Sequence, residues 1–421
     1  CIPSKALVRT SRLYAEMRDA ERYGAQIPGD IRVDFAAVMQ RMRKIRARIS
    51  RTASANDLAA CGIDVFFGAG RFVGPAALAL GDTTLRFHKA LIATGARPDT
   101  PPIPGLAEAG YYTNASVFDL TTLPQRLLVI GGGPLGCEMA QAFCRFGADT
   151  SIVQHWPLFL PREERDAAQI LSDAFARDGI EVRLNTKVVA VRVENGQTLV
   201  DMVSADYHST IATDAILAGT GRLPSVEGLG LEAAGVAHDR DRGVHVDDFL
   251  CTSNPNIYAA GDVCLDEKFN DVAEASAHIA VRNALEQRNE RYSELTIPWC
   301  TYTDPEIAHV GLYVRQARER KIPVKTFTVL MHDIDRAVAD SEEAGFVKIH
   351  VRDGTDHILG ATIVARHAGE MISEITLAMV AGVGLRTLSR VMHPYPTQGE
   401  AINRAADAYM RSLLPRPGRN E

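Results

Sequence analysis

A glycine-rich turn at residues 131–136 is the segment of this sequence whose spacing points most directly to a ligand. Its glycines fit the pattern G-x-G-x-x-G, and they lie between an apolar run at 127–130 and an apolar helical pattern. A dinucleotide fingerprint requires that context. Gly131 permits the tight turn, Gly133 lets the backbone approach a pyrophosphate, and Gly136 allows helix and strand to pack closely. The alternative, a turn that binds nothing, is disfavoured by the flanking elements.

The next predicted strand, 150–154, ends where a dinucleotide-binding fold places the residue that contacts the adenosine ribose. An acid there favours NAD, and a basic residue favours NADP. This sequence has Gln154 followed by His155. Gln154 can hydrogen-bond to a ribose hydroxyl, and His155 can meet a 2′-phosphate. The sequence therefore predicts that NAD(P)H binds, without deciding between the two cofactors.

Six further segments carry short patterns in a fixed order. They are CIPSK at 1–5, ATGARP at 93–98, GTGRLP at 219–224, IYAAGD at 257–262, PWCTYTDPE at 298–306 and HPYPTQGE at 393–400. Together with the glycine turn they resemble the class I pyridine nucleotide–disulfide oxidoreductases, a family that includes lipoamide dehydrogenase, glutathione reductase and mercuric reductase. The resemblance covers essentially the whole chain. It implies FAD and NAD(P)H as cofactors, a homodimer, and a small-molecule electron acceptor.

The resemblance assigns roles to the amino-terminal segment. Cys1 matches the second cysteine of the family's C-x-x-x-x-C-x-P-S-K pattern, the one that faces the flavin as a thiolate. Lys5 is expected near the flavin, paired with a carboxylate. Glu138 matches the acid that the family places near the nicotinamide. For Cys1 the alternative is an incidental terminal residue, which the matching segments disfavour.

Other positions are assigned to the cofactors in the same way. Thr94 and Gly95 belong to the turn that leaves the flavin domain, and Gly221 to the segment that leaves the nicotinamide domain. Gly261 and Asp262 belong to the second flavin fingerprint, in which the aspartate hydrogen-bonds the ribityl chain. A buried aspartate needs a partner, and a ligand hydroxyl would serve. The alternative is that Asp262 caps the following helix.

The carboxy-terminal segment 393–400 resembles the one that reaches into the partner subunit. Lipoamide dehydrogenase and glutathione reductase have histidine before Pro-Thr, where this sequence has Tyr395, with Glu400 retained. Tyrosine, with a pKa of about 10, is a poor base but can donate a proton. Mercuric reductases also carry tyrosine there, although their terminal cysteine pair has no counterpart in LLPRPGRNE. His393 is either a substitute acid–base group or a packed loop histidine.

These residues predict an FAD-dependent oxidoreductase that passes electrons from NAD(P)H, through flavin and a cysteine pair, to a disulfide, metal-ion or small-molecule acceptor. The favoured type is mercuric reductase-like, and dihydrolipoamide dehydrogenase is the alternative. Soluble transhydrogenase is a third and less favoured candidate. The family's first G-x-G-x-x-G unit and the partner cysteine would precede Cys1, so we expect an N-terminally truncated chain that holds FAD poorly and cannot form the redox disulfide. A non-catalytic, dimeric NAD(P)-binding protein is the alternative of another class.

The elements that must position these residues alternate between helix and strand. Helical patterns occupy 1–17, with Leu7 and Leu13 among the apolar positions, and 34–60. Short strands are predicted across 63–93, and α/β units follow. The expected fold is α/β, with two Rossmann-like three-layer ββα domains and an α+β carboxy-terminal dimerisation domain. The boundaries are 1–111 with 239–293 for an incomplete FAD domain that lacks its first βαβ unit, 112–238 for the NAD(P) domain, and 294–415 for dimerisation.

Composition narrows the function classes. The 421 residues are 46% hydrophobic and 23% charged with a net charge of −6, which gives no reason to expect nucleic acid as a partner. The longest apolar run near the end, 377–385, is too short to span a membrane. Seven scattered cysteines argue against a disulfide scaffold and a zinc site, so we expect a cytoplasmic protein with no metal site.

Overall fold

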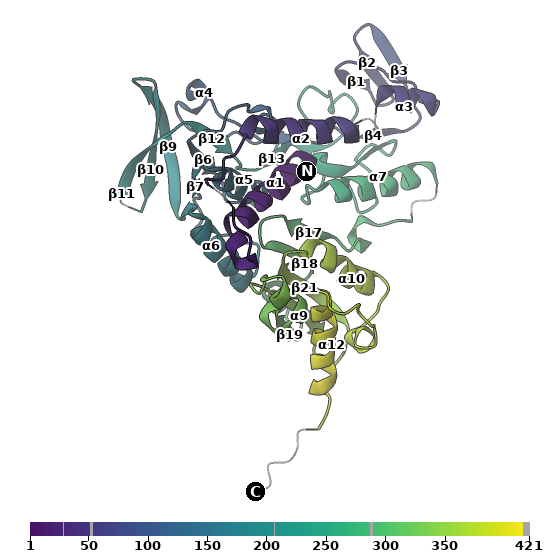
Figure 1. Cartoon of the computed structure of the whole chain (residues 1–421). Coiled ribbons are helices and arrows are strands. Elements are labelled where there is room, and N and C mark those ends of the chain that lie inside the picture. The colour runs from purple at the N-terminus through teal and green to yellow at the C-terminus, as the bar shows by residue number, and fades with distance from the viewer. Residues whose placement is uncertain (28, 51–53, 206, 287–288, 416–421) are drawn as a thin grey trace.

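The structure, a computed structural model, describes residues 1–415 except 28, 51–53, 206 and 287–288. Two α/β units form the upper part in Figure 1, and an antiparallel sheet with its helices forms the lower part. Among the described residues, none of the helices has both the length and the apolar character needed to cross a bilayer.

A parallel sheet holds the glycine turn. Its strand order is β12 (Ala215–Ala218), β6 (Arg126–Ile130), β7 (Asp149–Val153) and β8 (Glu181–Arg183). Helix α5 (Pro134–Phe146) connects β6 to β7, and α6 (Arg165–Asp178) connects β7 to β8. An antiparallel sheet of β9 (Thr186–Glu194), β10 (Gln197–Ser204) and β11 (Tyr207–Thr213) accompanies it.

Burial on both faces of the parallel sheet explains its uninterrupted apolar strands. Leu127 and Val129 point into the core shared with α5, whereas Leu128 and Ile130 pack against the antiparallel sheet at Val200. Successive side chains of a strand alternate between its two faces. The result is the three-layer ββα arrangement predicted for the NAD(P) unit.

The second α/β unit is made of two separate stretches of the chain, which flank the parallel-sheet unit in the sequence. Strand β4 (Ala90–Ile92) pairs in parallel with β16 (Ile257–Ala259), which is followed by α7 (Asn270–Leu285). Helix α1 (Ile2–Arg18) packs against α2 (Phe35–Ile49) and also against α5 of the neighbouring unit. The smaller elements are β1 (Gly70–Gly74), β2 (Ala77–Leu80), β3 (Thr83–Arg86), β5 (Ala96–Pro98), β13 (Arg222–Pro224), β14 (His238–Asp239), β15 (Gly243–Val244), α3 (Ala55–Ala60) and α4 (Leu106–Ala109).

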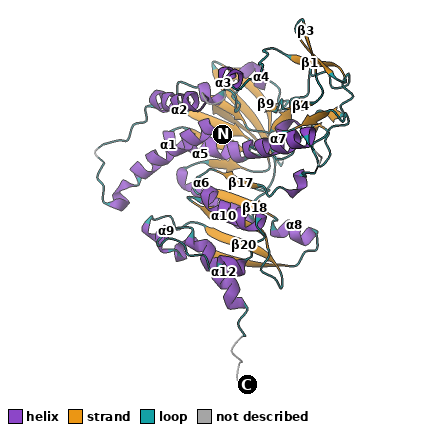
Figure 2. Ribbon diagram, turned by 90° about the vertical axis from the view of Figure 1, so that its right-hand side faces the viewer, coloured by secondary structure: helices purple, strands orange, loops and turns teal. Residues whose placement is uncertain are grey.

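The carboxy-terminal unit is a five-stranded antiparallel sheet. Its order is β17 (Pro298–Thr301), β18 (Glu306–Gly311), β21 (Ile358–Ala365), β20 (Phe346–Arg352) and β19 (Val324–Leu330). Helix α10 (Ala368–Val380) packs on β18 and β21, and α12 (Glu400–Ser412) packs on β19 and β20 (Figure 2). The remaining helices are α8 (Val314–Glu319), α9 (Asp335–Ala339) and α11 (Leu385–Leu388).

The prediction of one helix over 34–60 was wrong. Helix α2 ends at Ile49, and Ser54 begins α3 with a capping box in which it exchanges hydrogen bonds with Asp57. Residues 51–53 of the predicted helix lie outside the described residues. The helix predicted over 1–17 is present as α1, although Leu13, one of its apolar positions, is 44% exposed. The buried face of α1 is instead made largely of small and polar residues, including Ser11.

Candidate active site

Helix α1 positions Cys1 and Lys5. Cys1 occupies the N-cap and is exposed, and its carbonyl oxygen accepts hydrogen bonds from Ser4 Oγ at 3.0 Å and from the Lys5 amide at 3.2 Å. Leu7, which is fully buried, anchors the same turn in the core. The thiol therefore sits at the start of a 17-residue helix, where the unpaired amides favour negative charge.

Lys5 pairs with Glu138. Its Nζ lies 2.9 Å from both carboxylate oxygens, and the Tyr302 amide donates to the same carboxylate at 3.1 Å. The Lys5 ammonium also lies 4.5 Å from the centre of the Tyr302 ring. The Glu138 side chain is only 3% exposed, so its charge depends on these partners. Two residues that the sequence placed 133 positions apart thus meet where α1, α5 and the loop after β17 converge.

The glycine turn passes a direct geometric test for a dinucleotide. A Cβ on Gly131, whose φ is 107°, would lie 2.4 Å from the Gly219 carbonyl oxygen, and one on Gly136 would lie 2.1 Å from the Gly131 oxygen. A Cβ on Gly133, at the N-cap of α5, would meet nothing within 4 Å. Two glycines are therefore required by the protein's own packing, and the third leaves open space where a pyrophosphate would approach.

Gln154 and His155 behave differently at the end of β7. Gln154 is 5% exposed, and its side-chain amide donates to the Leu158 carbonyl oxygen at 2.6 Å. Its Oε1 faces Gly132, where a Cβ would lie 2.3 Å away. Gln154 therefore folds back onto the turn. His155 is exposed beside Trp156, so it is the accessible candidate for contact with the adenosine ribose.

Asp262 has a protein partner. It lies in the short 3-10 helix η4 (Gly261–Val263), and its Oδ2 is 2.8 Å from Arg222 Nη1. Arg222 also donates to the Ala96 carbonyl oxygen at 2.9 Å. The following helix, α7, has Phe269 at its N-cap, so Asp262 does not cap it. The residue at the second flavin fingerprint is thus held by an arginine from the segment that leaves the nicotinamide unit.

The turns at Thr94, Gly95 and Gly221 join the two α/β units. Thr94 Oγ1 donates to the Ser225 carbonyl oxygen at 2.8 Å, and the Gly221 oxygen accepts from the Asp99 amide at 3.0 Å. Gly95 and Gly221 have φ values of 68° and 133°, which favour glycine. Strands β5 and β13, which follow these turns, pair in antiparallel orientation. The two chain segments that connect the α/β units therefore lie side by side.

The three candidate residues of the carboxy-terminal segment each have another partner. The Tyr395 side chain, 73% exposed, donates its hydroxyl to Asp335 at 2.8 Å. His393 Nε2 lies 3.0 Å from Glu374, and Glu400 accepts from Arg404 at 2.8 Å. Among the contacts of the described residues, Glu400 orients neither Tyr395 nor His393.

Within one chain this segment lies far from Cys1. Figure 1 shows α12, which follows Tyr395, in the lower part of the molecule and the amino terminus in the upper part. Three buried atoms of the segment have no hydrogen-bond partner in the described part of the chain: His393 Nδ1, Gln398 Oε1 and Glu400 Oε2. Exposed apolar side chains lie nearby along the sequence at Met392, Val380 and Leu377.

Comparison with known proteins decides the family. The family model described as pyridine nucleotide-disulphide oxidoreductase matches residues 1–284, and that family's dimerisation domain matches residues 297–406. The chain belongs to the pyridine nucleotide–disulfide oxidoreductases. The predicted family and fold class are confirmed, and with them the use of FAD and NAD(P)H.

Several relatives of this oxidoreductase are similar over nearly its whole length. A mercuric reductase from Streptomyces lividans is 34% identical over 419 residues, which cover 97% of this chain and 87% of the relative. A dihydrolipoyl dehydrogenase from Chlamydia trachomatis is 32% identical over 95% of this chain and 86% of its own.

Solved structures agree. The HOCl-induced flavoprotein disulfide reductase RclA from Escherichia coli superposes with a TM-score of 0.86 at 28% identity, covering 99% of this chain and 90% of that one. LpdA from Mycobacterium tuberculosis has a TM-score of 0.87 at the same identity and coverage. The oxidoreductase is therefore an NAD(P)H-dependent flavoprotein enzyme by family.

Sequence reasoning missed three residues that the oxidoreductase places at its site. Tyr302 contacts both members of the Lys5–Glu138 pair, Arg222 holds Asp262, and Asp335 accepts from Tyr395. Tyr302 and Arg222 lie inside segments that the family patterns had already marked. Asp335 lies in no such segment, so its role became visible only through tertiary contact.

Proposed function

We propose that this flavoprotein passes electrons from NAD(P)H, through flavin and a redox-active cysteine pair of which Cys1 is one member, to a disulfide, metal-ion or small-molecule acceptor. Bound FAD would supply hydride acceptance and disulfide reduction, chemistry that side chains lack. The observation that carries the proposal is the Lys5–Glu138 ion pair. It joins α1, at Lys5 four residues after Cys1, to α5, at Glu138 four residues after Pro134.

Different residues of the site are proposed to bind NAD(P)H, to bind FAD and to activate the thiol. Gly131, Gly133 and Gly136 would hold the pyrophosphate of NAD(P)H, with His155 beside the ribose. Thr94, Gly95, Gly221, Gly261 and Asp262 would hold FAD. At the start of α1, Cys1 receives both the helix dipole and the positive charge of Lys5, which stabilise a thiolate. Glu138 pairs with the Lys5 ammonium and so restrains the conformation of the Lys5 side chain.

Tyr395 is the proposed proton donor at the site of the partner subunit, in a homodimer formed through the dimerisation domain. Its hydrogen bond to Asp335 raises the pKa of Tyr395, so the phenol stays protonated at neutral pH. His393 and Glu400 lie in the same segment and remain candidates for assisting it.

The acceptor is proposed to be of the mercuric reductase type. Tyr395 supports this choice, as does the similarity to mercuric reductases from several bacteria. RclA, a structurally similar flavoprotein, has been solved in a Cu(II) complex. Dihydrolipoamide dehydrogenase is the second candidate, because of the relative from Chlamydia trachomatis. We also propose a cytoplasmic location, which suits a reactive thiol, and the three domain boundaries given above.

One acceptor series tests the proposal. The protein, expressed with the flavin-binding and cysteine-bearing segment that the family carries before Cys1 and loaded with FAD, is assayed for NAD(P)H oxidation with Hg(II), Cu(II), lipoamide, oxidised glutathione and a quinone. The same FAD-loaded protein serves in every turnover assay. We expect turnover with a metal ion or a disulfide that exceeds turnover with the quinone. If the quinone alone is reduced, the thiol route is wrong. NAD(P)H binding with no turnover of any acceptor would favour a non-catalytic protein.

A further inference from the structure

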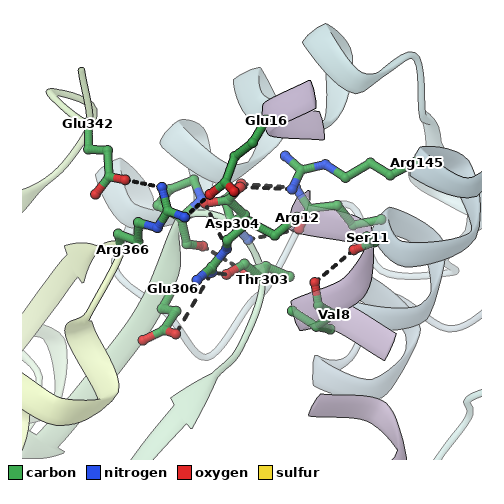
Figure 3. A network of polar contacts seen from close by, with 12 residues as sticks. Val8, Ser11, Arg12, Glu16, Arg145, Thr303, Asp304, Glu306, Glu342 and Arg366 are labelled. Carbon is green, nitrogen blue, oxygen red and sulfur yellow. Dashed lines mark hydrogen bonds and ion pairs between the residues drawn. The ribbon is translucent and has the colours of Figure 1, made fainter. Parts of the chain in front are cut away.

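Arg366 joins two carboxylates that come from the first and the last part of the chain (Figure 3). It follows β21 directly. Its Nη2 pairs with Glu16 and its Nη1 pairs with Glu342. Glu16 lies in the last turn of α1, and Glu342 follows α9. One guanidinium therefore ties the helix that begins at Cys1 to the carboxy-terminal unit.

The junction is shielded and requires an arginine. The Arg366 side chain is 25% exposed and that of Glu342 is 15% exposed, so solvent screens the pair only partly. A guanidinium presents several donors in a fixed fork and can bind two carboxylates at once, whereas a lysine ammonium is a single point charge. Arg366 is thus suited to hold two elements in a defined relation.

A second contact fixes the same face of α1. Arg12 lies one turn before Glu16, and it donates to the Thr303 carbonyl oxygen at 3.4 Å. Its guanidinium is 3.9 Å from Glu306 and 3.7 Å from Asp304. Residues four apart on a helix share a face. The last two turns of α1 are therefore held against the carboxy-terminal unit at two successive points.

The contact continues from Glu342 to the carboxy-terminal segment. The second oxygen of Glu342 accepts a hydrogen bond from Gln398 Nε2 at 2.8 Å. Gln398 is 5% exposed, whereas Tyr395, three residues earlier, is 73% exposed. Gln398 is therefore the point at which the exposed loop carrying Tyr395 is anchored. The full chain of contacts runs from α1 through Glu16, Arg366 and Glu342 to Gln398.

We propose that Arg366 is a positioning residue that couples the thiol helix of each subunit to the segment that bears Tyr395. This inference rests on the proposed function, in which Cys1 of one subunit acts with Tyr395 of the other. Each subunit then links its own thiol helix to the proton donor that it provides to its partner. A displacement of α1 at one site changes the geometry of the donor at the other.

Three variants separate this coupling from a loss of stability. Glu16→Gln removes only the contact with α1, and Arg366→Lys keeps the charge but loses the fork. Asp214→Asn is the matched control, because it removes the Arg126–Asp214 pair, whose carboxylate side chain has the same 36% exposure and belongs to another unit. Amide hydrogen exchange of residues 393–399 is measured in the protein without added cofactor, with β20 as an internal reference.

We expect exchange at 393–399 to become about tenfold faster in Glu16→Gln and Arg366→Lys, the size expected for losing a charge-assisted hydrogen bond. β20 in all variants, and the Asp214→Asn protein throughout, should be unchanged. Exchange at 393–399 that equals the wild type in Glu16→Gln would overturn the coupling.

Steady-state turnover of the FAD-loaded protein separates this inference from the proposed function. Glu16→Gln should lower kcat with a disulfide acceptor while the KM for NAD(P)H stays unchanged, because the glycine turn is untouched. If exchange accelerates but Tyr395→Phe keeps wild-type turnover, the coupling stands and the role proposed for Tyr395 is wrong. If exchange is unaltered, the coupling is wrong whatever the turnover.

Discussion

Lys5 and Glu138 form an ion pair in which one ammonium lies 2.9 Å from both oxygens of one carboxylate. The two ends of this pair are not equally buried, since the Lys5 side chain is 33% exposed and that of Glu138 is 3% exposed. The pair brings a thiol-bearing helix and a dinucleotide-binding helix to one point. Because the two side chains differ in burial, removing each in turn should change the free energy of unfolding by a different amount.

Removing Lys5 should destabilise the protein more than removing Glu138. In Lys5→Met the buried carboxylate keeps only the Tyr302 amide, and an uncompensated buried charge of this kind costs about 3 kcal/mol. In Glu138→Gln the freed ammonium can reach water, so we expect a loss of about 1 kcal/mol. Urea unfolding of both variants measures the difference. Equal losses, or the reverse order, would contradict the account.

Gly133→Ala should impair cofactor binding without impairing folding. The added methyl group meets no protein atom but occupies the space where a pyrophosphate approaches, so we expect affinity for NAD(P)H to fall about tenfold or more. Gly136→Ala is the informative contrast, because its methyl group would meet the Gly131 carbonyl oxygen and lower the melting temperature. Calorimetric titration and thermal unfolding are the measurements. Unchanged affinity in Gly133→Ala would place the cofactor elsewhere.

The hydrogen bond from Tyr395 to Asp335 should affect how turnover depends on pH. Tyr395→Phe should lower turnover of a disulfide acceptor about a hundredfold, the usual contribution of a general acid. The Asp335 hydrogen bond raises the pKa of Tyr395, and an acid with a raised pKa stays protonated to higher pH. Asp335→Asn should therefore move the alkaline loss of activity to lower pH. The pH profile of kcat/KM measures this.

The matched control is Asp333→Asn, which changes an exposed acid two residues away and should leave the profile in place. An alkaline limb that does not move in Asp335→Asn would show that Tyr395 is not the titrating donor.

Glu306 makes folding stability depend on pH. Burial raises the pKa of Glu306 to about 7, against the opposing effects of the Gly369 amide and Arg12. Between the ordinary value for a glutamate and pH 7 the folded protein holds a proton that the unfolded chain has released, so stability falls as pH rises through this window. Glu306→Gln should remove that loss and gain about 2 kcal/mol above pH 7.

Urea unfolding near about pH 4 and about pH 8 checks the sign of this effect, since linkage requires the gain to be absent at the lower pH. A difference between Glu306→Gln and wild type that does not vary with pH would show that Glu306 keeps its ordinary pKa.

The sequence could predict those parts of the fold that depend on local pattern. The glycine turn, its flanking strand and helix, and the long carboxy-terminal strands all follow from spacing and apolar period. The break between α2 and α3 was missed, although the apolar helical pattern lapses after Ile49 and the next large apolar residue is Leu58. Ser54 and Asp57 carry the signal for a new helix start, which was overlooked.

The site was less accessible to sequence reasoning, because its contacts are long-range. Lys5 was expected to have a carboxylate partner and Glu138 was identified separately, yet nothing local joins two positions so far apart. Gln154 illustrates the opposite problem. Its place at the strand end suggested a ribose contact, but tertiary packing turned its amide back onto Gly132.

The central claim is that Cys1 is the thiol through which electrons reach the acceptor. The most direct measurement is NAD(P)H-dependent turnover of the FAD-loaded Cys1→Ser protein with a disulfide and with a quinone, beside Cys61→Ser, which removes another exposed cysteine. We predict that Cys1→Ser abolishes disulfide reduction and keeps quinone reduction, while Cys61→Ser retains both. Disulfide reduction at the wild-type rate in Cys1→Ser would contradict the account.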